Sequence, residues 1–169
     1  MRSGKPLLYW DTSVLLAWIK DEPNEMEGVN DIAHGIHKNH YILLTSAITL
    51  TEVLESTLTD EARIKFNDLF KRKNCQMVAA DLRITQLASQ IRDYYQRQKS
   101  VDGLPSLSTP DAIHLATAIH YAVKEFHTFD EKDDPKKRRA LIPLSGNVAG
   151  HPLVICKPPI PAQLDLFAQ

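Results

Sequence analysis

The chain has 169 residues, 43% of them hydrophobic, and a formal net charge of −1 at pH 7. A chain of this length buries about 70% of the surface that its unfolded form exposes, so we expect one globular domain with a sizeable core. A charge near zero gives no global sign of binding to a polyanion or a membrane, so a nucleic acid would need a local basic patch.

The apolar runs are short throughout the chain. Asp11 interrupts the first of them, and no run reaches the roughly 18 uninterrupted apolar residues of a membrane helix. Cys75 and Cys156 have neither the number nor the spacing of a disulfide framework or a zinc site. We therefore expect a cytoplasmic protein with no membrane association.

Strand-like and helix-like patterns alternate along the chain. Apolar runs typical of buried strands cover residues 7–10, 41–45, 75–79, 125–129 and 153–156. Helical spacing of apolar residues predicts helices within 12–23, 24–40, 46–58, 60–73, 81–99 and 109–125. This alternation predicts an α/β fold with a mainly parallel sheet of about five strands, covered by helices on both faces.

The C-terminal residues 158–169 differ in composition from the rest of the chain. Pro158, Pro159 and Pro161 favour an extended backbone, so we expect a tail rather than a second domain. The apolar residues Leu164, Leu166 and Phe167 follow on a segment too short to bury them alone. Two alternatives remain open, namely a disordered end and a segment that docks onto the domain, a second protomer or a partner chain.

Four acidic residues stand where predicted strands end or predicted helices begin. Asp11 follows the first strand, and Glu52 lies in the helix after the second. Asp111 is at the start of the last helix, and Asp130 follows the fourth strand. In an open parallel sheet, ligands bind outside the carboxyl ends of the strands, where loops and helix N-termini meet. The four acids are therefore candidates for one site.

Each acid also has a purely structural explanation. Asp11 fits a helix N-cap, which contributes about 1 kcal/mol. The segment from Thr49 to Glu52 fits a capping box, and Thr109 fits a cap whose helix dipole favours Asp111 in the first turn. The turn TFDEKDD is acidic enough to be a solvated loop. Considered singly, no acid decides between structure and function.

Considered together, the acids favour a metal site. Two carboxylates about 4 Å apart repel each other by on the order of 4 kcal/mol at an effective dielectric constant of about 20, which exceeds the contribution of a cap. A cluster of four therefore requires protonation or a cation. Oxygen-only ligands select Mg²⁺ or Mn²⁺, and such an ion activates water for the hydrolysis of a phosphodiester.

The segments YWDTSVLLAW, TSAITLTEVLES, TPDAIHLATAIHYAV and FHTFDEKD resemble the PIN domain family, particularly its VapC-like toxin branch. The resemblance covers residues 6–157 and implies a three-layer α/β/α domain over residues 1–157, followed by the tail. It also implies a metal-dependent ribonuclease, a homodimer and an antitoxin protein as a partner. The chain is longer than a typical toxin of that branch, and its tail has no counterpart there.

The resemblance further implies roles for individual residues. The four acids of the family match Asp11, Glu52, Asp111 and Asp130, and a further acid a few residues on matches Asp133. The hydroxyl next to the first acid, which orients a carboxylate or a water, matches Thr12 or Ser13. His114 fits a common variant of the last helix; it either faces the site or is a packed or exposed helix residue, and we favour the second alternative.

Rival chemistries find less support in the sequence. A phosphatase of the haloacid-dehalogenase type also has an acid after its first strand, but it needs a second aspartate where this chain has Ser13. The sequence contains no Walker-type loop, no dinucleotide fingerprint and no motif for a serine or cysteine nucleophile.

We therefore predict an endoribonuclease in which Mg²⁺ or Mn²⁺ is held by the four acids, with Asp133 competing with Asp130 for the fourth position. The run DPKKRRA supplies cations for an RNA backbone, namely Lys136, Lys137, Arg138 and Arg139, and its structural explanation is a solvated helical face. The alternative function is a catalytically silent PIN-fold module for binding or assembly.

Overall fold

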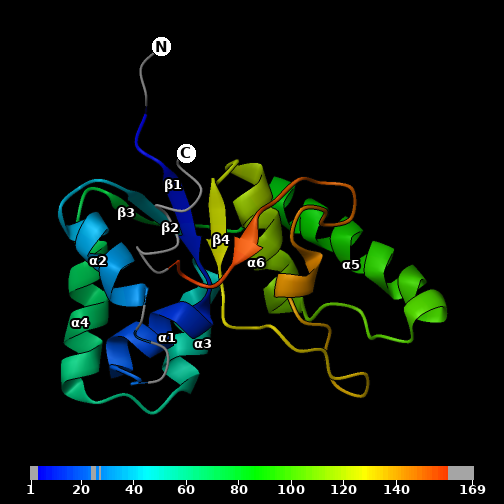
Figure 1. The fold of residues 1–169 in the computed structure, drawn as a ribbon, viewed down its shortest axis with the longest axis horizontal. Helices are drawn as coiled ribbons and strands as arrows, with labels where there is room; N and C mark the ends of the chain where they lie inside the picture. The colour runs from blue at the N-terminus through cyan, green and yellow to red at the C-terminus, as the bar shows by residue number, and fades with distance from the viewer. Residues whose placement is uncertain (1–3, 24–25, 27, 160–169) are drawn as a thin grey trace.

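The computed structural model describes residues 4–23, 26 and 28–159, and these contain one five-stranded sheet (Figure 1). The strands are β1 (Leu7–Trp10), β2 (Ile42–Ser46), β3 (Cys75–Val78), β4 (Glu125–His127) and β5 (Ile155–Cys156). Their order in the sheet is β3-β2-β1-β4-β5, and all neighbouring strands are parallel. The predicted parallel sheet is confirmed, although β4 and β5 are shorter than their apolar runs.

Six α-helices connect or flank the strands in the described part of the chain. They are α1 (Thr12–Lys20), α2 (Val29–His37), α3 (Ile48–Glu55), α4 (Asp60–Phe70), α5 (Leu82–Asp102) and α6 (Thr109–His120). A short 3-10 helix, η1 (Ile142–Leu144), precedes β5. Side-chain caps begin several of them, and Asp81 at the start of α5 accepts hydrogen bonds from two backbone amides. None of the described helices is both long and apolar enough to cross a membrane.

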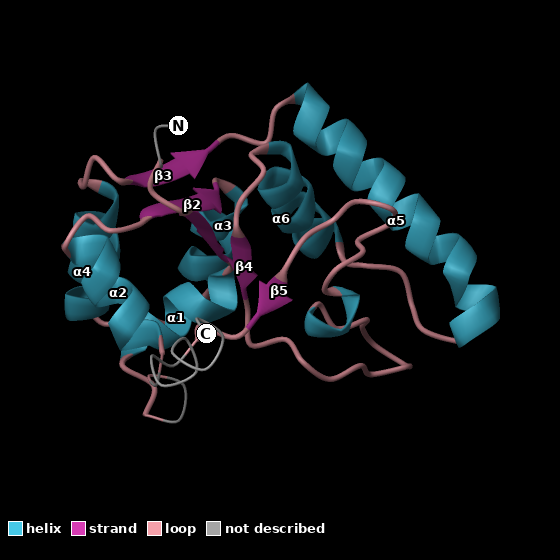
Figure 2. Ribbon diagram, turned by 45° about the horizontal axis from the view of Figure 1, so that its top comes forward, coloured by secondary structure: helices cyan, strands magenta, loops and turns pink. Residues whose placement is uncertain are grey.

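Consecutive strand residues point to opposite faces of the sheet, and both faces are covered. Tyr9, Leu44 and Phe126 pack in a core with α5 and α6. Leu8, Trp10 and Leu43 pack in a second core with α1, α2 and α4. Figure 2 shows these two groups of helices on opposite sides of the sheet. The three-layer α/β/α architecture is thus confirmed, and it explains why the strand LLYW carries apolar side chains without alternation.

The order of the strands creates a switch point beside β1. The chain passes from β1 outwards through β2 to β3, and it later adds β4 and β5 on the other side of β1. At such a reversal the connections diverge to opposite faces and leave a crevice outside the carboxyl ends of the strands. Asp11 directly follows β1, and Asp130 follows β4, so the crevice has an acid on both of its strands.

The end of the described chain packs against the N-terminus of α2. Pro158 is buried, and a Cβ atom on Gly28 would lie 2.3 Å from the Pro158 carbonyl oxygen. Gly28 also has a φ of +82°, a conformation that favours glycine. The predicted tail from residue 160 onwards, with Leu164, Leu166 and Phe167, lies outside the described residues. The boundary after residue 157 stays a prediction.

Candidate functional site

Four of the predicted acids lie at the carboxyl edge of the sheet on four different segments. Asp11 is the N-cap of α1, Glu52 lies within α3, Asp111 is in the first turn of α6, and Asp130 is in the loop after β4. Their charges act on one another, since Asp111 and Asp130 each experience the repulsion of other members of the group. We call Asp11, Glu52, Asp111 and Asp130 the acid cluster.

Asp11 is a helix cap and a buried acid at the same time. Its Oδ1 accepts hydrogen bonds from Ser13 Oγ at 2.6 Å and from the backbone N–H of Val14 at 3.2 Å. Ser13 Oγ in turn accepts from the backbone N–H of Phe129 at 3.1 Å, which ties α1 to the segment after β4. Burial raises the pKa of Asp11 in spite of these hydrogen bonds, because only 7% of the residue is exposed. Capping is confirmed, and it does not account for the burial.

The structural explanation of Glu52 as part of a capping box is wrong. Helix α3 begins at Ile48, and its N-cap, Ala47, has no side-chain hydrogen bond. Thr49 lies inside the helix, where its hydroxyl shares a 2.8 Å hydrogen bond with that of Thr45. The Glu52 carboxylate is therefore free of the helix terminus.

Two donors instead hold one oxygen of Glu52. Oε2 accepts a short hydrogen bond from Thr12 Oγ1 and a 2.8 Å hydrogen bond from His114 Nε2. Burial acts to raise the pKa of Glu52, but the hydrogen bonds from His114 and Thr12 hold it below its ordinary value. Glu52 is thus stabilised in its charged form, unlike Asp11.

Asp111 lies in the first turn of α6, and the cap of this helix is Ser108 rather than the predicted Thr109. Ser108 Oγ accepts from the backbone N–H of Asp111 at 3.1 Å and donates to the Asp111 carboxylate. Thr109 and Pro110 occupy the first two helical positions, so the cap lies one residue earlier than the motif predicts. Burial raises the pKa of Asp111, and the negative charges of Asp11 and Glu52 raise it further.

The side chain of Asp130 is mostly buried, and one of its oxygens lies against Arg138. Its side chain is 12% exposed, and Arg138 Nη1 lies in ion-pair contact with Oδ1. Among the described residues, no donor has hydrogen-bond geometry to this buried oxygen. Burial raises the pKa of Asp130 to about 6; Arg138 opposes the rise, while the charges of Asp111 and Asp11 add to it.

The remaining predicted residues are placed differently. Asp133 is exposed, and its Oδ1 accepts a 2.8 Å hydrogen bond from the backbone N–H of Ala140, which closes the loop 130–141. The basic run lies on this loop rather than on a predicted helical face, with an isolated bridge between Asp134 and Arg138. Lys136, Lys137 and Arg138 are exposed.

Arg139 belongs to the core instead of the surface. It is 5% exposed, its Nη1 lies 2.7 Å from an Asp102 oxygen, and its guanidinium stacks over the Tyr95 ring at 4.8 Å. Its Nε also donates to the Pro105 carbonyl at 3.0 Å. These partners use the guanidinium fully, so Arg139 does not present its charge to a nucleic acid in this arrangement.

The sequence favours His114 as a packed or exposed residue, whereas the structure places its ring against the site. It is 2% exposed, and its two ring nitrogens contact Glu52 and the hydroxyl of Tyr9, the latter at 2.7 Å. The spacing of three residues from Asp111 is the available sequence signal, because such residues share a helix face. The part played by Tyr9 has no sequence signal, because it depends on the contact between β1 and α6.

A second histidine–glutamate pair lies on the opposite face of the sheet. Glu125, His127 and Cys156 place one candidate ligand atom each within 4.8 Å of one another. However, the Trp10 indole, which can only donate, gives its N–H to His127 Nδ1 at 3.2 Å. Neutral His127 must then carry its proton on Nε2, where it donates to Glu125 at 3.0 Å. The nitrogen that would bind a metal is therefore protonated, so the geometry disfavours a metal at this cluster.

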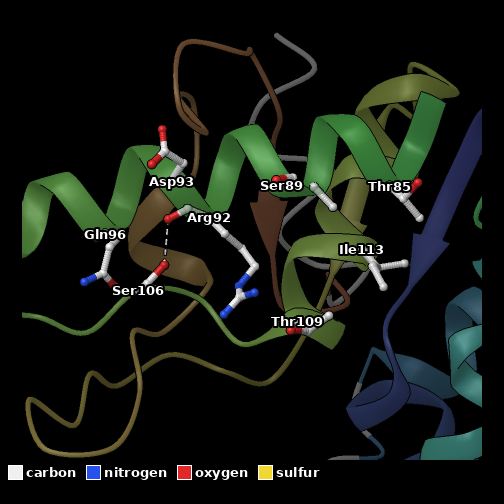
Figure 3. A pocket seen from close by; sticks show the side chains of 9 residues that line it. Thr85, Ser89, Arg92, Asp93, Gln96, Ser106, Thr109 and Ile113 are labelled. Carbon is white, nitrogen blue, oxygen red and sulfur yellow. Dashed lines mark hydrogen bonds between the residues drawn. The ribbon is translucent and has the colours of Figure 1, made fainter. Parts of the chain in front are cut away.

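A groove of about 410 Å³ lies between α5 and α6, on the side of α6 that carries Thr109 and Ile113 (Figure 3). Arg92 Nε donates to the Leu107 carbonyl at 3.1 Å, and Ser106 Oγ donates to the Arg92 carbonyl at 2.7 Å, so the loop before α6 is fastened to α5. Asp111 lies about 200° around the helix from Thr109, so the groove is separate from the acid cluster.

The acid cluster fits a hard divalent cation in its chemistry. It offers carboxylate oxygens only, and the buried Oδ1 of Asp130 lies against the Arg138 guanidinium without a hydrogen bond from any described residue, so this oxygen already faces a cation. No three of its described acids have oxygens within 4.8 Å of one another. An ion would therefore draw the carboxylates together or bind some of them through water, as Mg²⁺ commonly does.

Two solved structures are similar to this chain, and the first of them shares its fold. A chain of the VapBC2 structure from Rickettsia felis, determined with a DNA fragment from their promoter, superposes with a TM-score of 0.57 at 16% identity, over 88% of this chain and 96% of that one. A chain of FitAcB from Neisseria gonorrhoeae gives a TM-score of 0.49 at 20% identity, over 73% and 87%. No curated protein sequence matches this chain.

The sequence itself supplies the assignment to a family. The family model of the PIN domain matches residues 8–137, a range that contains the whole acid cluster and three of the four strand pairings of the sheet, namely those among β1, β2, β3 and β4. This chain belongs to the PIN domain family.

Proposed function

We propose that this chain is a Mg²⁺- or Mn²⁺-dependent endoribonuclease that hydrolyses RNA phosphodiesters, and that it is the toxin of a toxin–antitoxin pair. The acid cluster carries this proposal. Burial and mutual repulsion raise the pKa of Asp111 and Asp130, and burial raises that of Asp11. Such an arrangement opposes folding in the absence of a cation, so a cation site is the simplest reason for it.

Asp11, Glu52, Asp111 and Asp130 would hold the metal. When bound, a divalent ion of this kind supplies Lewis-acid activation of water and of the phosphoryl group. Ser13 and Thr12 would orient the Asp11 and Glu52 carboxylates, to which they donate hydrogen bonds. Asp133 would be the alternative to Asp130 for the fourth position; the Ala140 amide donates to its Oδ1, and its Oδ2 would be the oxygen offered to the metal.

The RNA backbone would be contacted by the exposed cations of the loop 130–141, which starts at the acid cluster itself. Arg138 lies against Asp130, and Lys136 and Lys137 precede it on the same loop. Figure 1 shows this loop leaving the carboxyl end of β4. The positive charge is therefore next to the place where a scissile phosphate would bind.

An antitoxin and a second copy of the chain are proposed as partners. Membership of the PIN family supports this, together with the fold shared with a toxin–antitoxin structure. Helices α3 and α4 expose Leu50 (40%), Leu54 (63%) and Ile64 (60%), which a partner could cover.

The test compares two aspartates that both cap helices. Asp11 caps α1 within the acid cluster, whereas Asp81 caps α5 on the protein surface. Since asparagine caps a helix about as well as aspartate, Asp11→Asn and Asp81→Asn both keep the cap and lose the charge. We expect wild type and Asp81→Asn to gain thermal stability from Mn²⁺ and to cleave RNA, and Asp11→Asn to do neither.

Two results would contradict the proposal. Cleavage by wild type that persists in excess EDTA would exclude a metal-dependent nuclease. A wild-type protein that neither gains stability from Mn²⁺ nor cleaves RNA would support the silent binding module instead.

A further inference from the structure

A continuous line of hydrogen bonds runs from the backbone of β2 to the acid cluster. The backbone N–H of Ser46 donates to Tyr9 Oη at 3.0 Å, and Tyr9 Oη lies 2.7 Å from His114 Nδ1. His114 Nε2 lies 2.8 Å from Glu52 Oε2. Ser46, Tyr9 and His114 are all buried, so water does not compete for the first two of these contacts.

The direction of each hydrogen bond follows from the two ends of the line, which are a backbone donor and a carboxylate acceptor. A backbone amide can only donate, so Tyr9 Oη is the acceptor for Ser46. At the other end of the line the Glu52 carboxylate can only accept, so His114 Nε2 carries a proton. In the neutral ring Nδ1 is then an acceptor, and it takes the hydroxyl proton of Tyr9. Glu52 and Tyr9 together therefore fix the tautomer of His114.

This hydrogen-bond order makes the two oxygens of the Glu52 carboxylate different. Thr12 and His114 both donate to Oε2, and within the described residues no donor reaches Oε1. The two oxygens of Glu52 are therefore unequal, because Oε2 is engaged by the protein and Oε1 is left for another partner. Two donors on one oxygen also fix the rotation of the carboxyl group.

We infer that His114, with its tautomer fixed by Tyr9 and Glu52, is a positioning residue that holds the Glu52 carboxylate so that Oε1 is offered to the cation. This inference rests on the proposed function, because it assumes that the cation binds at the acid cluster. It assigns to the histidine of the last helix a role that depends on β1. Neither His114 nor Tyr9 needs to touch the substrate in this role.

The chain provides a matched control on the other face of β1. His127 is also fully buried, it also accepts from an aromatic residue of β1, and it also donates to a glutamate. His127 has no contact with the acid cluster through its ring. A loss of packing alone would therefore appear in variants of both histidines, whereas a loss of positioning would appear only at His114.

The first measurement is the ¹⁵N spectrum of the histidine rings in the metal-free wild type. We expect His114 as the neutral Nε2–H tautomer, and we expect Tyr9→Phe to perturb this signal. A His114 ring protonated on Nδ1 would overturn the inference, whatever the protein does with metals.

The second measurement is Mn²⁺ affinity by calorimetry in full-length wild type and variants. Loss of a residue that orients a ligand costs roughly 10–100-fold in metal affinity, so we expect such a loss for His114→Leu and a smaller one for Tyr9→Phe. We expect His114→Gln, whose amide can still donate to Glu52, to retain most of the affinity, and His127→Leu to retain all of it.

The outcomes separate the inference from the proposed function. Normal Mn²⁺ affinity in folded His114→Leu or Tyr9→Phe would overturn the positioning role alone. Absence of Mn²⁺ binding in wild type, with the expected tautomer present, would overturn the proposed function and the cation-positioning role, while the hydrogen-bond order would stand. If His114→Leu does not fold, Tyr9→Phe and the ¹⁵N spectrum still decide.

Discussion

Two histidine–glutamate pairs lie on opposite faces of the same strand and have the same hydrogen-bond order. Tyr9 contacts His114, which contacts Glu52, and the next residue, Trp10, contacts His127, which contacts Glu125. His114 and His127 are 2% and 0% exposed. Buried histidines of this kind are thus one way in which this sheet satisfies its polar groups.

The two pairs differ in the charges around their glutamates. Glu125 has Lys124 Nζ at 3.7 Å, and the hydrogen bond from His127 is the largest influence that lowers its pKa. Glu52 lies beside Asp11 and Asp111, whose own pKa values are raised. The same hydrogen-bond pattern therefore packs a sheet on one face and supports a candidate site on the other, and the neighbouring acids make the difference.

The largest expected effect distinguishes the two glutamates, Glu52 and Glu125. Glu52→Gln keeps an oxygen for His114 and Thr12 but removes the charge. We expect it to lower Mn²⁺ affinity and RNA cleavage by at least about 100-fold, since loss of a ligand exceeds the roughly 10–100-fold cost of an outer residue. Glu125→Gln should leave both unchanged, as measured by calorimetry and single-turnover cleavage. Equal losses in the two variants would mean that the acid cluster has no special role.

Much of the fold could be predicted from the sequence, because local patterns determine it. The apolar runs and the helical spacing between them predicted the parallel sheet and both helical layers. Helix N-caps are harder to predict where two residues that can cap a helix are adjacent, as Ser108 and Thr109 are before Pro110. The TLTE segment looks like a capping box, yet the backbone continues helically from Ile48, which a local motif cannot reveal.

The candidate site could be predicted only where its residues stand at element ends. Asp11, Asp111 and Asp130 follow strands or begin a helix, so topology alone brings them to one edge. By contrast, the support of Glu52 depends on residues far apart in the sequence. Glu52 and His114 are 62 positions apart, and Tyr9 and His114 are 105 positions apart. The burial of Arg139 depends on Asp102 and is equally remote from any local pattern.

The second expected effect is on the pH dependence of stability in EDTA. The pKa of Asp130 is raised from 3.8 to about 6, so between these pH values the folded state binds more protons than the unfolded state. Stability contributed by this group therefore falls as the pH rises through this window, by up to roughly 3 kcal/mol. We expect Asp130→Asn to be more stable than wild type above pH 6 in urea unfolding experiments.

The contribution of Glu125 to stability should have the opposite pH dependence. Its pKa is lowered from 4.5, so its contribution is present above that pH and is lost as the pH falls. Glu125→Gln is therefore expected to be less stable than wild type at pH 7, with the difference shrinking on acidification. An Asp130→Asn variant with the wild-type profile would show that Asp130 is not strained in the metal-free protein.

The smallest expected effect concerns the loop 130–141, where adjacent residues again divide between packing and solvent. Lys136 and Lys137 are exposed, whereas Arg139 is buried against Asp102 and Tyr95. Each phosphate contact with a single strand contributes about 0.7 to the slope of log affinity against log salt. Replacing both lysines by glutamine should therefore flatten the slope by up to about 1.4 for RNA binding in EDTA, where no cleavage occurs.

Arg139→Gln is the control for this measurement, because it removes one charge from the same run without removing an exposed one. It breaks the ion pair with Asp102 and the contact with Tyr95, so we expect a lower melting temperature and an unchanged salt slope. The reverse result, a flatter slope in Arg139→Gln and a normal slope in the double lysine variant, would mean that the loop rearranges to release Arg139 when RNA binds. The contrast between packing and binding residues would then not hold for this loop in the complex.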